Sequence, residues 1–312
     1  MALSIIDQLQ SSTRQELRHR VWIMSDLQQS DPDSARNCLT QAVDDFRSLD
    51  LDCEQIWYLG DAVEGRGLER LEDMAAMHIE LLAPFEIPLK YVCGNHEFDP
   101  DLRRVKAGEA LGEAPVRVRT REAFEQVPGW RTTEKLSDFY FTDSLGDYTL
   151  FFFSDHAQEH GEWISTHGKV FGNADAYPHS EDVYVALREE IERSPGPVIL
   201  AGHIAFGGGL RPSALMDRML PLPENVRVHF YGHSHIGDAA WGGPECFRKY
   251  STVNTQKIPQ FDVAALENIR GDAIRSAILE IYDDGSFGVI YREHCRQRWS
   301  DAFYIAADPA SS

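Results

Sequence analysis

The sequence lacks paired cysteines, long apolar runs and a secretory leader pattern, and each absence excludes a class of protein. Its five cysteines are scattered and form no C-x-x-C pair, so neither a zinc ribbon nor a disulfide framework is indicated. We interpret them as reduced thiols of a cytoplasmic protein. No segment approaches the roughly 18 to 20 consecutive apolar residues of a transmembrane helix, so no membrane partner is expected. The first residues lack a basic start followed by an apolar stretch, which argues against a secretory signal.

Basic residues are also scarce. The chain has 30 Lys and Arg, only six of them Lys, against 50 Asp and Glu, which gives a formal net charge of -20. Such a surface repels nucleic acid at long range, so we expect no binding of long nucleic acid. A small anionic substrate would need a local positive centre, and bound metal ions could supply one.

What is present is a globular composition without repeats or linkers, and we predict a single domain over residues 1–312. Within it we expect a leading helix over residues 1–19 and a C-terminal tail over residues 296–312. The segment 157–180 is rich in Gly, His, Asn and Asp, and is long for a loop in a compact domain. We predict that it is an active-site loop.

The first hundred residues alternate between strand and helix patterns. Short β-rich runs at 20–24, 54–59 and 87–93 are separated by stretches with helical apolar spacing at 34–49 and 67–82, the first helix opening on a possible serine cap. This alternation predicts an α/β fold with parallel strands and crossover helices. Further along, the pattern predicts hairpins that turn at residues 145–147 and 284–285, a helix over 181–194, and strands over 197–202 and 226–232.

Polar side chains follow five of these strands directly. They are Asp26 and Gln28, Asp61, Asn95 and His96, His203, and His233 and His235. Because the carboxyl ends of parallel strands line the ligand crevice of an open α/β sheet, we expect these turns to converge on one edge. Each turn alone is more often structural, as a cap or a simple turn, and it is the ordered set that indicates a site.

Such a set is what a two-metal hydrolytic site needs. Oxygen ligands and imidazoles hold two divalent ions about 3.5–4 Å apart, with one carboxylate shared between them. Two such ions, two aspartates and a bridging hydroxide leave about one positive charge, which suits a phosphodiester or part of a phosphomonoester.

At this point the sequence resembles a known family. The segments "SDLQ", "GDAVEGRG", "GNHEFD", "AGHIAF" and "GHSH" are similar to the ordered motifs of the calcineurin-like metallophosphoesterases. The resemblance implies a four-layer αββα sandwich, in which two mixed β-sheets are flanked by helices and the metal site lies at the C-terminal edge of the strands.

The resemblance also implies roles for these residues. Asp26 and His235 would bind a first metal, with Gln28 in place of the usual histidine, and Asp61 would bridge both metals. Asn95, His203 and His233 would bind the second metal. His96 would lie over the phosphoryl group, where it would stabilise charge or protonate the leaving oxygen, and a metal-bound hydroxide would be the nucleophile.

Gln28 departs from the Asp-x-His pattern that is usual in the family. A glutamine carbonyl is a neutral oxygen donor, harder than an imidazole, and shifts the preference of the first site from zinc toward manganese, magnesium or ferrous iron. Manganese-dependent ADP-ribose/CDP-alcohol diphosphatases similarly carry Asp-x-Gln, so manganese is the leading expectation. Alternatively, Gln28 does not ligate, or is a turn residue in an inert fold.

The substrate follows less directly from the sequence. We expect a small phosphodiester or pyrophosphate, nucleotides included, with Arg66 and His156 as candidate substrate contacts. "GDAVEGRG" is also similar to a turn of serine/threonine phosphoprotein phosphatases, but with one residue inserted before Arg66. A phosphomonoesterase, on protein or small molecule, and an inactive scaffold with a degraded site remain the alternatives. The oligomeric state stays open.

Overall fold

The computed structural model describes twelve stretches of the chain. They are residues 16–29, 31–64, 71–97, 140–153, 157–159, 162–164, 170–171, 177–209, 216–235, 248–253, 256–269 and 273–307.

The first of two six-stranded sheets has the strand order β15-β14-β13-β1-β2-β3. Its strands are β1 (Leu17–Met24), β2 (Gln55–Leu59), β3 (Leu89–Val92), β13 (Arg275–Tyr282), β14 (Phe287–Glu293) and β15 (Arg298–Ile305). β1, β2 and β3 are parallel, whereas β13 pairs antiparallel with β1 and the hairpin of β13 and β14 continues to β15. The sheet is therefore mixed, with its parallel half formed by the first strands of the chain.

The second sheet has the order β11-β12-β10-β9-β5-β4. Its strands are β4 (Tyr140–Leu145), β5 (Tyr148–Phe153), β9 (Val198–Gly202), β10 (Val226–Tyr231), β11 (Tyr250–Thr252) and β12 (Pro259–Asp262). The four inner strands are parallel and the two edge strands antiparallel. A small third sheet joins β6 (Ala157–Glu159), β7 (Glu162–Ile164) and β8 (Val170–Phe171).

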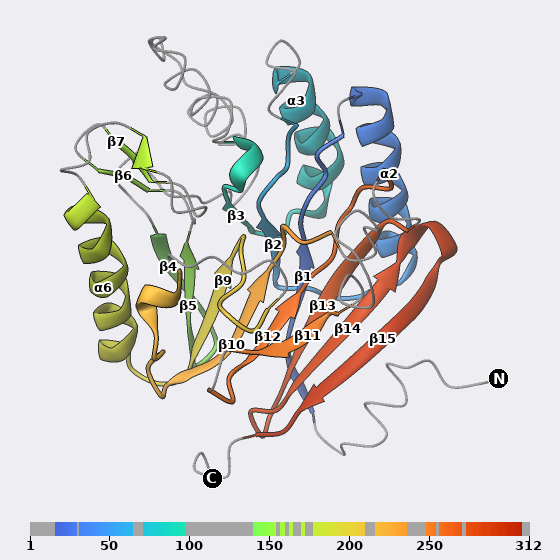
Figure 1. Ribbon diagram of the computed structural model, residues 1–312. Coiled ribbons are helices and arrows are strands. Elements are labelled where there is room, and N and C mark those ends of the chain that lie inside the picture. The colour runs from blue at the N-terminus through green and yellow to red at the C-terminus, as the bar shows by residue number, and fades with distance from the viewer. Residues whose placement is uncertain are drawn as a thin grey trace.

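Helices cover the outer faces of the two large sheets, as Figure 1 shows. They are α2 (Pro32–Ser48), α3 (Leu71–Leu82) and α6 (Tyr177–Arg193), with 3-10 turns η2 (Ala83–Phe85), η4 (Met216–Met219) and η7 (His294–Arg296). β1 shows how the layers arise, since Trp22 and Met24 pack toward α2 and α3, while Val21 and Ile23 pack between the sheets. A third apolar cluster joins α6 to the second sheet. The predicted four-layer αββα sandwich of two mixed sheets is confirmed.

α2 begins one turn earlier than its sequence pattern suggested. Its N-cap is Asp31 rather than Ser34, because the Asp31 carboxylate accepts hydrogen bonds from the Ser34 amide at 2.9 Å and from its hydroxyl at 2.7 Å. Pro32 then occupies the first turn, where its missing N–H costs nothing. The boundaries of β2, β3, β9 and β10 agree with expectation to within about two residues, whereas β1 begins three residues earlier than expected.

Three of the predicted segments need correction. The expected leading helix ends in a strand, since Leu17–His19 already belong to β1, and residues 1–15 lie outside the described ones. The expected tail contains β15, which pairs with β14 along its length. The expected loop 157–180 contains β6, β7, β8 and the start of α6. Strand pairing overrode the local pattern: the start of β1 pairs with the distant β13, whereas β15 pairs with the adjacent β14, and β6, β7 and β8 pair with one another.

Candidate metal centre

The predicted ligands lie where strands of the two sheets end. Asp26 follows β1, Asp61 follows β2 and Asn95 follows β3, while His203 follows β9 and the pair His233 and His235 follows β10. All of these side chains, and that of Gln28, are buried. Segments more than 200 residues apart are in direct contact here, since the His233 amide donates to Asp26 Oδ2 at 2.9 Å. The edge that the sequence predicted is thus assembled from both sheets.

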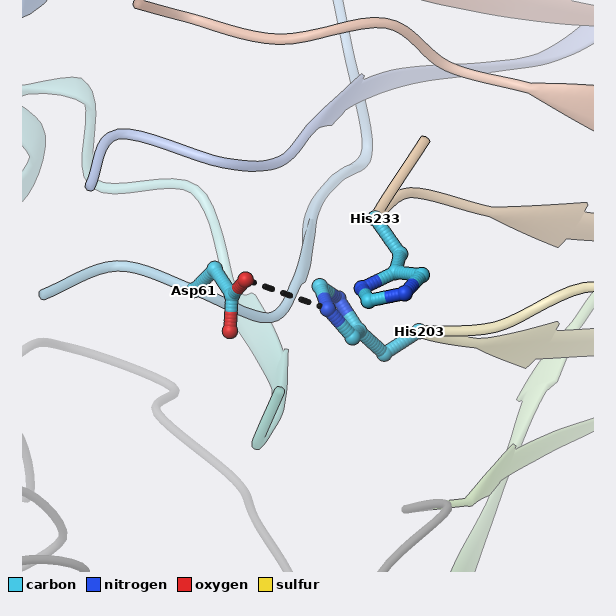
Figure 2. A group of neighbouring side chains, drawn as sticks. All are labelled: Asp61, His203 and His233. Atoms are coloured by element: carbon cyan, nitrogen blue, oxygen red, sulfur yellow. Dashed lines mark ion pairs between the residues drawn. The ribbon is translucent and has the colours of Figure 1, made fainter. Parts of the chain in front are cut away.

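The ligand-type atoms form two groups that share one carboxylate. Asp61, His203 and His233 make one group, and Asp26, Asp61 and His235 make the other, with the donor atoms in each group within 4.8 Å of one another. Figure 2 shows the group of Asp61, His203 and His233, in which the Asp61 carboxylate faces His203 and the His233 ring lies beside it. Two adjacent groups that share an aspartate are the arrangement of a two-metal site with a bridging carboxylate.

His203, at the predicted second metal site, is held in one orientation. His203 Nδ1 lies 2.6 Å from the Leu59 carbonyl, so a neutral ring donates there and presents the lone pair of Nε2 to the site. Nε2 lies 3.3 Å from Asp61 Oδ2 and 3.2 Å from Asn95 Oδ1. Electron-pair donors that face one another in this way are stabilised by a cation between them.

Gln28 lies at the group of Asp26, Asp61 and His235, which is the predicted first metal site. Its side-chain amide contacts Nε2 of His235 directly, and the same nitrogen lies 3.4 Å from Asp26 Oδ1. The oxygen and nitrogen of a glutamine amide are interchangeable by a half turn, so either atom can face His235. With its oxygen inward, Gln28 presents a neutral donor at the point where Asp26 and His235 converge.

Backbone strain is concentrated at the predicted ligands. Asp26, Asp61, His233 and His235 all have left-handed backbone conformations, with φ of 59°, 54°, 68° and 49°. Such conformations cost on the order of 1–3 kcal/mol each for residues other than glycine and persist only where the surroundings enforce them. Their concentration at four of the seven predicted ligands indicates a functional site.

Glycines allow the ligand turns to approach one another. A Cβ on Gly94 would lie 2.3 Å from Asp61 Oδ1, and one on Gly232 would lie 2.6 Å from Asp26 Oδ2. Both glycines directly precede predicted ligands, so the small residue lets the next side chain point into the site.

Glu97 is a residue of this centre that the sequence reasoning missed. Its buried carboxylate accepts four backbone hydrogen bonds, from Asp61 at 3.1 Å, Ala62 at 2.8 Å, Val63 at 3.3 Å and Gly94 at 2.7 Å. It thereby ties the turn after β2 to the turn after β3. The sequence feature that could have indicated it is its position directly after Asn95 and His96. A glutamate there has backbone donors within reach in its own turn and in the turn after β2.

His96 lies at the rim of the centre between two carboxylates. Its backbone N–H donates to Asp61 Oδ1 at 2.7 Å, and its ring Nδ1 lies 3.2 Å from Glu64 Oε1. Burial lowers the pKa of His96, but Asp61 and Glu64 outweigh it and raise that pKa to about 9. A protonated imidazole at this place could stabilise an anion or donate a proton.

The two aspartates differ in their electrostatic surroundings. Burial raises the pKa of Asp26 above its ordinary value, against the opposing effect of His235 and His203. Burial also acts to raise the pKa of Asp61, but His203 and His96 hold it below its ordinary value. Asp61 is therefore a carboxylate in a cluster of imidazoles, as a shared ligand needs to be.

The residues fit a pair of divalent cations. Among the described residues, Asp26 Oδ1 is buried and accepts no hydrogen bond, which is costly for a carboxylate oxygen unless a cation lies beside it. The donors are carboxylate oxygens, amide oxygens and imidazole nitrogens, which suit manganese, iron or zinc.

Two predicted substrate contacts, Arg66 and His156, lie outside the described residues.

A cavity of about 890 Å³ lies at the opposite, amino-terminal ends of β9 and β10 and is separate from the centre. Gly196, Asn225 and their neighbours line it. Within the described part of the chain, no helix is both long and apolar enough to cross a membrane.

Comparison with known proteins gives a family and a fold. Residues 19–237 match the family described as calcineurin-like phosphoesterase. No curated protein matches the chain. Among solved structures, it resembles a dimetal phosphatase from Danio rerio at 12% identity and a TM-score of 0.58, with 94% of this chain and 100% of that chain covered.

A second solved structure is the purple acid phosphatase PPD1 from yellow lupin (Lupinus luteus) seeds. It is 14% identical with a TM-score of 0.51, and 94% of this chain and 54% of the lupin chain are covered. The chain thus spans about half of the lupin enzyme. At these identities, the two structures support the fold alone.

Proposed function

The chain belongs to the calcineurin-like phosphoesterases, a family of metal-dependent phosphoric ester hydrolases, and from that premise we propose that it cleaves a small phosphodiester or pyrophosphate at a two-metal centre. The observation that carries the proposal is the pair of ligand groups that share Asp61. Asp26, Gln28 and His235 would complete the first site, and Asn95, His203 and His233 the second. Nucleotides are among the substrates that this chemistry would accept.

The protein's own residues would place the phosphoryl group and handle a proton. When bound, the two ions would supply Lewis acidity and lower the pKa of a water molecule. Asp61 would hold both sites in register. His96, fixed by Glu64 at 3.2 Å, would contact the phosphoryl oxygen or protonate the leaving oxygen. Arg66 and His156 remain the proposed substrate contacts.

Manganese is the metal that we propose for the first site, because a neutral amide oxygen beside one imidazole is a harder donor set than two imidazoles. The buried thiols of Cys38 and Cys53 form no disulfide, which supports the reduced, cytoplasmic setting that we also propose. The formal net charge of -20 supports a small substrate in preference to long nucleic acid.

A phosphomonoesterase is the second candidate. The two solved structures whose fold the chain shares bear the names of phosphatases, and the same fold is compatible with a monoesterase. The two candidates separate on model substrates, since a diesterase cleaves bis-p-nitrophenyl phosphate and a monoesterase prefers p-nitrophenyl phosphate.

The test measures metal content and turnover together. We would determine bound metal by elemental mass spectrometry on the wild type, on Gln28→His and on Gln41→His, a control on the surface of α2. We expect two metals per wild-type chain with turnover of the diester, and the same for the control. Preference for the monoester would favour the second candidate. One metal or none, with turnover only in Gln28→His, would mean a degraded site in a scaffold protein.

A further inference from the structure

The carboxylate of Glu267 lies directly behind the first site, on a segment that no sequence motif marked. Its Oε1 is 2.8 Å from Nδ1 of His235, and the two side chains are 1% and 6% exposed. The opposite nitrogen of the same ring, Nε2, faces Asp26 and Gln28. Glu267 therefore lies on the side of the ring away from the predicted metal, at ion-pair distance from Nδ1.

The two sites differ in this respect. At the second site, His203 Nδ1 lies 2.6 Å from the neutral carbonyl oxygen of Leu59. At the first site the corresponding partner is a carboxylate. The first site is also the one in which Gln28 stands where a histidine is usual, so that it has one imidazole whereas the second has two. The stronger acceptor thus lies behind the site with the weaker donors.

We propose that Glu267 is a positioning residue for the first metal, which fixes His235 with Nε2 toward the ion and strengthens that nitrogen as a donor. This proposal rests on the metal centre of the proposed function, not on its substrate. A carboxylate behind a ligating histidine fixes the tautomer and the plane of the ring and raises the basicity of the ligating nitrogen. Glu267 would thereby offset the neutral, weaker donor that Gln28 offers.

The segment that carries Glu267 is fastened to the first ligand turn. The Leu266 amide donates to the Ser25 carbonyl at 3.0 Å, and Gln29 Nε2 donates to Asn268 Oδ1 at 3.1 Å. Glu267 lies between these two contacts. Because the residues on either side are bound to the turn that carries Asp26 and Gln28, local hydrogen bonds hold Glu267 beside that turn.

The experiment measures Mn²⁺ binding to the full chain without substrate, by the electron paramagnetic resonance signal of free Mn²⁺. Asp26→Ala identifies which of the two binding steps belongs to the first site. We expect Glu267→Gln to weaken that step by about 10- to 100-fold and to leave the other step within about 2-fold of wild type. In a Gln28→His background, we expect Glu267→Gln to weaken Mn²⁺ binding at the first site less. The loss of affinity, in logarithmic units, should be less than half of that in the wild-type background.

Glu280→Gln is the matched control, because Glu280 is also a buried glutamate but lies in β13 and pairs with Arg20 of β1 at 2.6 Å. It should lower stability without changing either binding step. Unchanged Mn²⁺ affinity in Glu267→Gln, or equal weakening of both steps, would overturn the proposal. If Glu267→Gln does not fold, Glu267→Asp replaces it, with an intermediate loss at the first site expected and no loss contradicting the proposal.

Because the Mn²⁺ binding experiment contains no substrate, its result does not depend on the proposed activity. Wild-type protein that binds two ions but cleaves neither model ester would refute the proposed activity and leave the role of Glu267 intact. Loss of the first ion in Glu267→Gln alone would support that role whichever ester the wild type prefers.

Discussion

At the scale of single residues, the centre combines strained ligands with one unstrained anchor. The Asp61 backbone is left-handed, and Glu97 receives hydrogen bonds from Asp61 and from the two residues that follow it. A glutamate that satisfies several buried N–H groups can offset strain of a few kcal/mol, because each of those groups would otherwise be buried without an acceptor. Glu97 thus holds the strained turn in place.

We predict that Glu97→Gln lowers the free energy of unfolding by about 2–4 kcal/mol, because a glutamine would turn an NH₂ group toward two backbone donors. Equilibrium denaturation in urea, with the metal removed, measures this loss. Glu54→Gln is the control, since Glu54 pairs with His19 near the surface and should cost less than about 1 kcal/mol. A loss as small as that of the control would mean that Glu97 does not hold the turn.

The residues of the centre were predictable to different degrees. Asp26, Asp61 and His203 could be predicted because each directly follows an apolar run, and runs and turns are local features of the sequence. The contact between Glu267 and His235 is tertiary, since the two residues lie on different segments and no spacing relates them. The placement of Arg66 and His156 remains a prediction.

At the scale of elements, the same distinction holds. Apart from β12, the parallel strands and the two hairpins have strong apolar patterns with clear turns, and were predicted. β11 has three residues and β12 begins with a proline, so neither has a strand pattern long enough to detect. β15 is an edge strand that is mostly half-exposed, so its pattern is weak. That β13 pairs with β1 depends on contacts across more than 250 residues.

A buried polar network joins α2 to the first sheet. Asp45 accepts from Arg292 at 2.8 and 2.7 Å and lies 2.8 Å from His294 Nδ1, while His294 Nε2 lies 2.7 Å from Ser276 Oγ. Trp22 Nε1 donates to the same hydroxyl at 2.8 Å. The serine, histidine and aspartate are in the order of a hydrolase triad, but all three are buried, so the network is structural.

We predict that Asp45→Asn costs about 3–5 kcal/mol of stability, because it leaves the buried Arg292 without a counter-charge. The midpoint of chemical denaturation measures this. Glu80→Gln is the control, since its pair with Arg36 is largely exposed and should contribute little to stability. Metal binding should not change in either variant, and a loss of metal in Asp45→Asn at temperatures where it remains folded would contradict the structural role.

At the scale of the whole molecule, buried titratable groups determine how stability depends on pH. Burial lowers the pKa of His78 to about 4, from a value of about 6.5 in the unfolded chain. Burial also acts to raise the pKa of Glu293, but Arg298 and Arg275 outweigh it and lower that pKa to about 2. As the pH falls, the unfolded chain therefore takes up a proton at His78 below about pH 6.5, and at Glu293 below about pH 4.5.

Between pH 6.5 and pH 4.5, the contribution of His78 can thus be measured apart from that of Glu293. In this range the unfolded state binds a proton that the native state does not, so His78 makes stability fall as the pH falls. Glutamine at this position does not titrate. We predict that the difference in the free energy of unfolding between His78→Gln and wild type shifts by about 2 kcal/mol in favour of the variant from pH 7 to pH 5. Urea denaturation at each pH measures this shift.

The control for this experiment is Tyr58→Phe, which removes the hydroxyl that lies 3.4 Å from His78 Nε2 but keeps the imidazole. Its stability should run parallel to that of the wild type from pH 7 to pH 5, because the titrating group is still present and still buried. If His78→Gln also ran parallel, the imidazole would have to gain its proton equally in both states. The burial of His78 against Tyr58 and the Met74 carbonyl at 2.8 Å would then not be maintained in solution.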